Sequence, residues 1–89
     1  MALRILSSPG TPERVVADLR TAIESAIAGA EVEVAASSPG HFEISVTSEA
    51  FAGRSRVQQQ QLVYGAIAHL MKGDAAPVHA VDQLTTELP

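Results

Sequence analysis

Three histidines carry most of the chemistry that this 89-residue chain could perform. His79 stands inside the apolar stretch 78–81 and His41 begins a second apolar stretch. A histidine in an apolar strand usually has a structural role with its ring hydrogen-bonded, and metal binding is the rarer alternative. On residue type alone we therefore favour a structural role for His79, with metal binding as the rarer alternative, and interpret His41 as an exposed residue at the end of a predicted strand. His69, on a predicted helix, is interpreted as a surface residue.

A second candidate site is formed by Arg54, Ser55 and Arg56, which follow Gly53 just before a predicted helix. Two arginines beside a helix N-terminus could bind a phosphate or a carboxylate. Two solvated arginines at a helix start are the simpler interpretation, which the sequence favours. The net charge of −4 provides no general attraction to a nucleic acid, so binding there would need a local basic patch.

Several function classes are excluded or disfavoured by composition. The chain has no cysteine, which excludes disulfides, a thiol nucleophile and a thiolate metal site made by this chain alone. We find no Ser–His–Asp spacing, no phosphate loop and no HExxH motif, so we expect no enzyme. No run approaches the roughly 20 apolar residues of a membrane span, and the N-terminus is a poor secretion signal, so we expect a cytoplasmic protein.

One domain over residues 1–89 is expected, with residues 1–10 as a loosely held lead. The first helix is predicted over 12–28, from a Thr11 cap and Pro12 to Gly29. Its core-facing residues recur at helical spacing: Val15, Val16, Leu19, Ile23, Ala26 and Ile27.

Strict alternation predicts two strands, 31–36 and 41–47, joined by the turn 37–40 as a hairpin. A second helix is predicted over 57–72, a third strand over 78–84 and a tail over 85–89. The order helix–strand–strand–helix–strand indicates a two-layer α+β domain with a three-stranded mixed sheet. Because a helical crossover normally joins parallel strands, the third strand should be parallel to a hairpin strand.

Between the hairpin and the second helix, Phe51 is predicted to be a buried plug between sheet and helix. Gly53 should reverse the chain there with a positive φ.

These residues together resemble the BolA family. The similarity runs over residues 12–86 and is closest to the bacterial IbaG-like branch. The residues that carry it are Phe51, Gly53, Ser55, Arg56, Val57, Gln61, Val63, Tyr64, Gly65, Val78, His79, Ala80 and Val81. The resemblance implies a fold similar to the type II KH domain. It also implies a role in iron–sulfur cluster handling with monothiol glutaredoxins and, in some members, DNA binding and a part in the stress response.

The same resemblance implies a set of cluster ligands. His79 occupies the position of the histidine that ligates a [2Fe–2S] cluster in BolA proteins, and His41 is a weaker candidate for the second ligand. Since such a cluster takes four ligands and this chain has no thiolate, a cluster would be shared with a partner. In the family, glutaredoxin and glutathione supply the sulfurs. We therefore expect a non-catalytic adaptor that is a monomer, or a weak homodimer, when alone.

The chain departs from the family pattern in two places. Many relatives carry Arg-His-Arg where this chain has glutamines 59–61, and IbaG-like members usually keep lysines near Gln58 and Gln59. DNA binding, the alternative function through Arg54, Arg56 and the following helix, should therefore be weak. The family also usually ends in a last helix with a Pro and a Trp, which is missing or vestigial in the tail 85–89.

Overall fold

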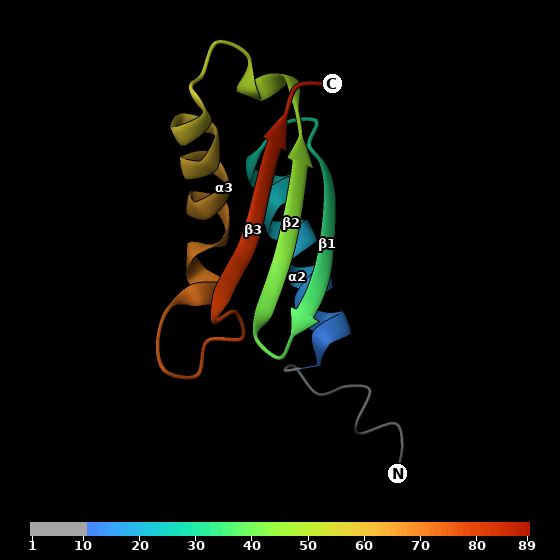
Figure 1. The fold of residues 1–89 in the computed structure, drawn as a ribbon, viewed down its shortest axis with the longest axis vertical. Helices are drawn as coiled ribbons and strands as arrows, with labels where there is room; N and C mark the ends of the chain where they lie inside the picture. Colours follow the sequence, from blue (N-terminus) through green and yellow to red (C-terminus); the bar gives the residue numbers. More distant parts are fainter. Residues whose placement is uncertain (1–10) are drawn as a thin grey trace.

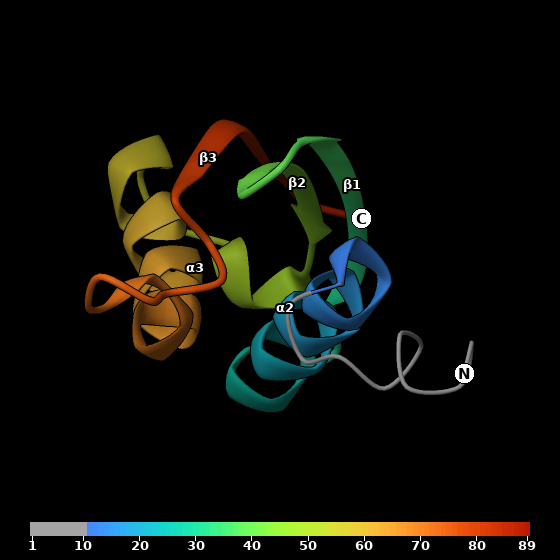
Figure 2. The same ribbon diagram turned by 90° about the horizontal axis from the view of Figure 1, so that it is seen from below.

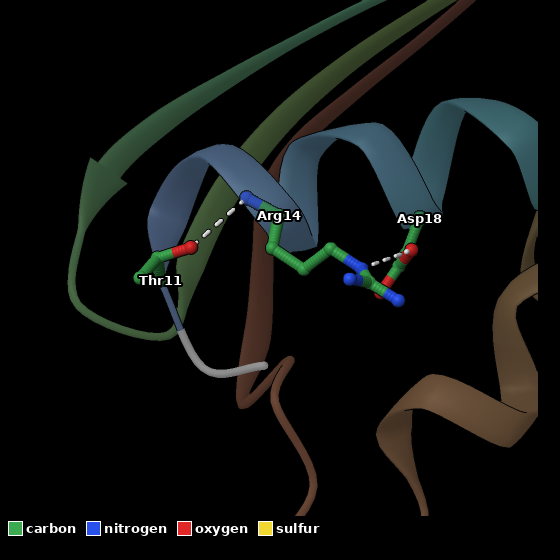
Figure 3. Close-up of polar contacts among 3 residues, drawn as sticks. All are labelled: Thr11, Arg14 and Asp18. Carbon is green, nitrogen blue, oxygen red and sulfur yellow. Dashed lines mark hydrogen bonds and ion pairs between the residues drawn. The ribbon is translucent and has the colours of Figure 1, made fainter. Parts of the chain in front are cut away.

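The first described helix, α2 (Pro12–Ala26), begins as predicted in a computed structural model that describes residues 11–89. The Thr11 hydroxyl accepts a hydrogen bond from the Arg14 amide at 3.3 Å, and Arg14 Nε donates to Asp18 one turn later at 3.2 Å (Figure 3). This exposed ion pair contributes little to stability. The predicted lead, residues 1–10, lies outside the described residues.

Helix α2 ends two residues before the predicted boundary, because Ile27 already has extended backbone angles as the C-cap. The predicted core stripe is confirmed at Val15, Leu19, Ile23 and Ile27, which are buried, and Val16 packs against them. Ala26 was wrongly included, since it is exposed.

The hairpin consists of antiparallel strands β1 (Glu31–Ser38) and β2 (His41–Thr47). The bounds of β2 are as predicted, and its inward residues Phe42, Ile44 and Val46 are buried. The prediction of a four-residue turn was wrong. Ser38 still pairs with His41, so only residues 39–40 connect the strands, with Gly40 at φ +77°. The extra residue of β1 is accommodated as a bulge between Ala36 and Ser38.

Strand β3 (Ala80–Glu87) is parallel to β2, which gives the predicted mixed sheet in the order β1-β2-β3. Its predicted bounds, 78–84, were shifted too early. The Val78 amide donates to the Leu70 carbonyl and the His79 amide to the Gly40 carbonyl, so both amides are used before the parallel ladder begins at Ala80, whose amide also donates to the Gly40 carbonyl.

At the other end, the predicted tail belongs largely to β3. Thr86 is buried and the Glu87 carbonyl accepts from the Ser48 amide at 3.0 Å. Within the described residues no helix follows β3.

Helices α2 and α3 (Arg56–Met71) cover one face of the curved sheet and leave the other face open (Figures 1 and 2). Helix α3 begins and ends one residue earlier than predicted. The core between the layers is mainly aliphatic, with Phe42 and Phe51 as its largest side chains. Neither helix in the described part of the chain has the length and apolar character that crossing a membrane requires.

The connection from β2 to α3, which we call the corner (residues 48–54), contains the short 3-10 helix η1 (Glu49–Phe51). Phe51 is 0% exposed and Gly53 has φ +75°, so both predictions for the corner are confirmed. The buried Ser48 hydroxyl donates to the Ala28 carbonyl at 2.8 Å and accepts from the Ala50 amide. These bonds tie the corner to the loop after α2.

Candidate functional site

His79 lies in the loop before β3, not inside the strand, and its side chain is exposed. Its ring packs over Gly40 of the hairpin turn. A Cβ built on Gly40 would come within 2.6 Å of His79 Nδ1, closer than two such atoms can approach. The His79 amide also donates to the Gly40 carbonyl at 2.8 Å. Gly40 therefore adopts the positive φ of the turn, leaves space for the His79 ring because it has no side chain, and accepts the hydrogen bond of the His79 amide.

The sheet register brings the two candidate histidines to the same end of the sheet. His41 is the first residue of β2 and pairs with Ala80, the residue after His79. We call this region, made of Ser37, Gly40, His41, His79 and Asp82, the histidine end. It lies at the opposite end of β2 and β3 from the corner (Figure 1).

Asp82 is a member of this region that the sequence analysis missed. Its Oδ1 lies 3.0 Å from His41 Nδ1, and its Oδ2 accepts from the Ser37 hydroxyl at 3.1 Å. The hydrogen bond with His41 is the main cause of a lowered pKa for the Asp82 carboxyl; the Ser37 bond and the charge of His41 act in the same direction, against a partial loss of hydration. The carboxyl is therefore ionised at neutral pH.

Two strand irregularities produce this contact. The register of β1 against β2 shifts between Ala36 and Ser38, so Ser37 is the unpaired residue of the bulge. The register of β3 against β2 shifts between Phe42 and Glu43, so Asp82 is unpaired in the same way. Sequence alternation shows neither bulge. The only available signal was a single aspartate directly after the apolar stretch 78–81.

The sequence-predicted anion site, by contrast, is organised as a helix start. The Ser55 hydroxyl accepts from the Gln58 amide at 3.1 Å, and the Gln58 side chain accepts from the Ser55 amide at 2.9 Å. This capping box satisfies amides that an anion would otherwise bind. Arg54 Nε donates to the Ala50 carbonyl, and Arg56 is exposed in the first turn of α3. The arrangement matches the simpler interpretation of two arginines at a helix start.

Gln59, in the run of glutamines 58–61, is part of the fold. Its Nε2 donates to the carbonyls of Phe51 and Arg54, at 3.3 and 3.1 Å. Its Oε1 accepts from the buried Thr86 hydroxyl at 2.7 Å. The side chain thus links α3, the corner and β3, a role that composition did not indicate.

The remaining motif residues divide between core and surface. Val63 is fully buried on α3, whereas Tyr64 is 40% exposed and His69 is exposed. Within residues 11–89, no three His, Asp or Glu side chains gather closely enough to hold a metal ion.

Comparison with known proteins identifies the family. The model of the family described as BolA-like protein matches residues 19–87. A search of curated proteins gives no match.

Among solved structures, a BolA homologue from Coxiella burnetii is 28% identical with a TM-score of 0.67, covering 89% of this chain and 91% of that one. BolA1 from Mus musculus is 30% identical with a TM-score of 0.66, covering 89% of this chain and 67% of that one. The BolA domain of SufE1 from Arabidopsis thaliana is 25% identical with a TM-score of 0.67, covering 84% of this chain and 92% of that domain. The fold, the residues matched by the family model and these similarities show that the chain belongs to the BolA-like family.

Proposed function

We propose that this protein is a non-catalytic adaptor that partners a monothiol glutaredoxin and shares a [2Fe–2S] cluster with it. The observation that carries the proposal is the placement of His79 and His41, from two distant segments, at one exposed end of a BolA fold. His79 is the stronger candidate ligand, because the family resemblance sets it at the position of a cluster-ligating histidine; its ring lies against Gly40 of the hairpin turn.

The residues of the histidine end fit half of a cluster site. Two imidazoles can replace two thiolates on one iron of such a cluster, which raises its reduction potential. The chain has no cysteine, so the partner and glutathione would supply the sulfur ligands. A bound cluster would provide iron–sulfur transfer or sensing, while this chain binds the partner and presents the imidazoles.

The S-R-V stretch at 55–57 and the Q-x-V-Y-G stretch at 61–65 support placement in the IbaG-like branch. We expect a cytoplasmic role in cluster handling or the stress response, with a monomer or weak homodimer in the absence of the partner. DNA binding through Arg54 and Arg56 ranks lower, because the helix start at these arginines is already capped by Ser55 and Gln58.

The proposal is tested by mixing the purified protein with a cluster-loaded monothiol glutaredoxin. A heterodimer with an altered visible spectrum is expected, whereas the protein alone should be colourless. His79→Ala should abolish the change in the spectrum while circular dichroism shows an intact fold. His69→Ala, a change of an exposed histidine on α3, is the matched control and should leave the spectrum of the complex unchanged. An altered spectrum that persists in His79→Ala would disprove the assignment of the ligand.

A further inference from the structure

We propose that Asp82 is a positioning residue that holds His41 by its Nδ1 and leaves Nε2 as the nitrogen available to a metal. The inference rests on the proposed function for its purpose, but it makes a separate claim about the state of the free protein. The claim concerns which nitrogen of His41 carries the proton.

The hydrogen bond between the two side chains fixes this choice. An ionised carboxylate can only accept hydrogen bonds, so the contact of 3.0 Å between Asp82 Oδ1 and His41 Nδ1 requires a proton on Nδ1. In a neutral imidazole the other nitrogen, Nε2, then carries the free lone pair. Histidines that ligate metals almost always donate their second ring N–H to a carboxylate, a backbone carbonyl or water.

The backbone around the pair is shaped to make this contact. Ser37 and Asp82 are the unpaired residues of two bulges, one on each side of the start of β2. Bulges redirect side chains and are frequent beside functional sites. Ser37 donates to the second oxygen of Asp82, so both carboxylate oxygens are held in place. All three strands thus contribute to the orientation of one imidazole.

His41 remains accessible while it is oriented. Its side chain is 41% exposed and that of Asp82 is 43% exposed, so a partner protein can reach the ring. The group of side chains Ser37, Asp82 and His41 differs from a hydrolytic triad, in which the serine gives its proton to the histidine. Here the Ser37 hydroxyl donates to Asp82 instead of to His41, which makes Ser37 a support for the carboxylate.

Long-range ¹H–¹⁵N correlation spectra of the free, labelled protein, recorded at alkaline pH, test the claim. His41 is expected in the Nδ1–H tautomer, and His69 serves as an internal control in the Nε2–H tautomer that free histidine prefers. Asp82→Ala should shift His41 to the Nε2–H form, and Asp82→Asn, which keeps an acceptor oxygen, should restore part of the Nδ1–H form. An Nε2–H tautomer of His41 in the unsubstituted protein would overturn the inference.

A titration with cluster-loaded monothiol glutaredoxin separates this inference from the proposed function. Asp82→Ala is expected to lower the apparent affinity with which the altered spectrum forms by about 10- to 100-fold. This is the usual effect of removing the group that orients a metal ligand. If Asp82→Ala binds as the unsubstituted protein does, the positioning role is wrong although the adaptor function stands. If the unsubstituted protein gives no altered spectrum but shows the Nδ1–H tautomer, the cluster function fails and the orientation of His41 by Asp82 is upheld.

Discussion

At and around the corner, polar side chains make hydrogen bonds inside the protein, whereas at the histidine end they are held in place but left open to solvent. Ser48, Gln59 and Thr86 make internal hydrogen bonds around a Phe51 ring that is 0% exposed. His79 and Asp82, at the other end, are exposed. One end of the sheet is thus closed by internal hydrogen bonds around a buried ring, and the other presents polar side chains to solvent.

The largest expected effect is at the corner. Phe51→Ala removes a fully buried ring and should cost about 3–5 kcal/mol of unfolding free energy, a large part of the stability of so small a domain. Partner binding should weaken with the loss of structure. Thermal unfolding and a titration with the partner measure the two effects, and Tyr64→Ala, at a 40% exposed aromatic residue, is the control with a much smaller loss. If Phe51→Ala keeps its melting temperature yet loses the glutaredoxin, Phe51 is a contact residue and the comparison fails.

Two glycines with positive φ, one at each end, allow a matched test of the comparison. An alanine with positive φ lowers the unfolding free energy by roughly 1–2 kcal/mol. We expect this loss at both Gly53, with φ +75°, and Gly40, with φ +77°. A Cβ at Gly53 meets nothing within 4 Å, whereas at Gly40 it meets the His79 ring. Gly40→Ala should therefore be the more destabilising and should shift the NMR signals of the His79 ring. Equal losses, with the His79 signals unchanged in both variants, would show that Gly40 does not position His79.

A smaller effect is expected in the acid stability of the histidine end. The pKa of Asp82 is lowered in the folded protein, chiefly by His41, so its contribution to stability is present above the ordinary carboxyl pKa and is lost as the pH falls through the folded value. His41→Ala should raise the pKa of Asp82 towards its ordinary value, as followed by NMR titration of the carboxyl carbon. The small difference in unfolding free energy between His41→Ala and the unsubstituted protein should disappear in acid. A pKa of Asp82 that does not change in His41→Ala would show that the pair contributes nothing.

The smallest expected signal is DNA binding at the corner. Arg54 and Arg56 stand beside a capped helix start on a chain with a net charge of −4. Duplex DNA should bind with a Kd of about 10⁻⁴ to 10⁻⁶ M, the non-specific range, and salt should weaken it further. Fluorescence anisotropy at two salt concentrations measures this. Tight and sequence-selective binding that is lost in Arg54→Ala/Arg56→Ala would make the corner a functional end and reverse the comparison.

Local signals predicted most of the fold. The Thr11–Pro12 start fixed the beginning of α2, and the alternation of residues 41–47 gave β2 its observed bounds. The start of β3 was misplaced because an apolar stretch predicts extended backbone without showing its hydrogen-bond partners. The Val78 amide donates to the Leu70 carbonyl of α3, and the His79 amide donates to the Gly40 carbonyl of the hairpin turn. Neither partner can be read from the apolar stretch itself.

The candidate site was predicted only in part, for the same reason. His79 and His41 were found from residue type and family resemblance, and the register places them at the same end of the sheet. Asp82 was missed because its contact with His41 depends on a bulge that only pairing between strands reveals. Gln59 was interpreted as a lost basic residue, since its bonds to Phe51 and Thr86 arise from tertiary packing.

The most direct test of the division between the two ends is to record amide NMR spectra of the labelled protein as cluster-loaded glutaredoxin is added. A paramagnetic cluster broadens the signals of nearby nuclei, so the position of the broadened residues reports where the partner's cluster binds. The account predicts that the signals of residues 37–41 and 79–82 are lost first, while those of the corner, residues 48–54, remain. Loss of the corner signals first, with the histidine end unaffected, would contradict it.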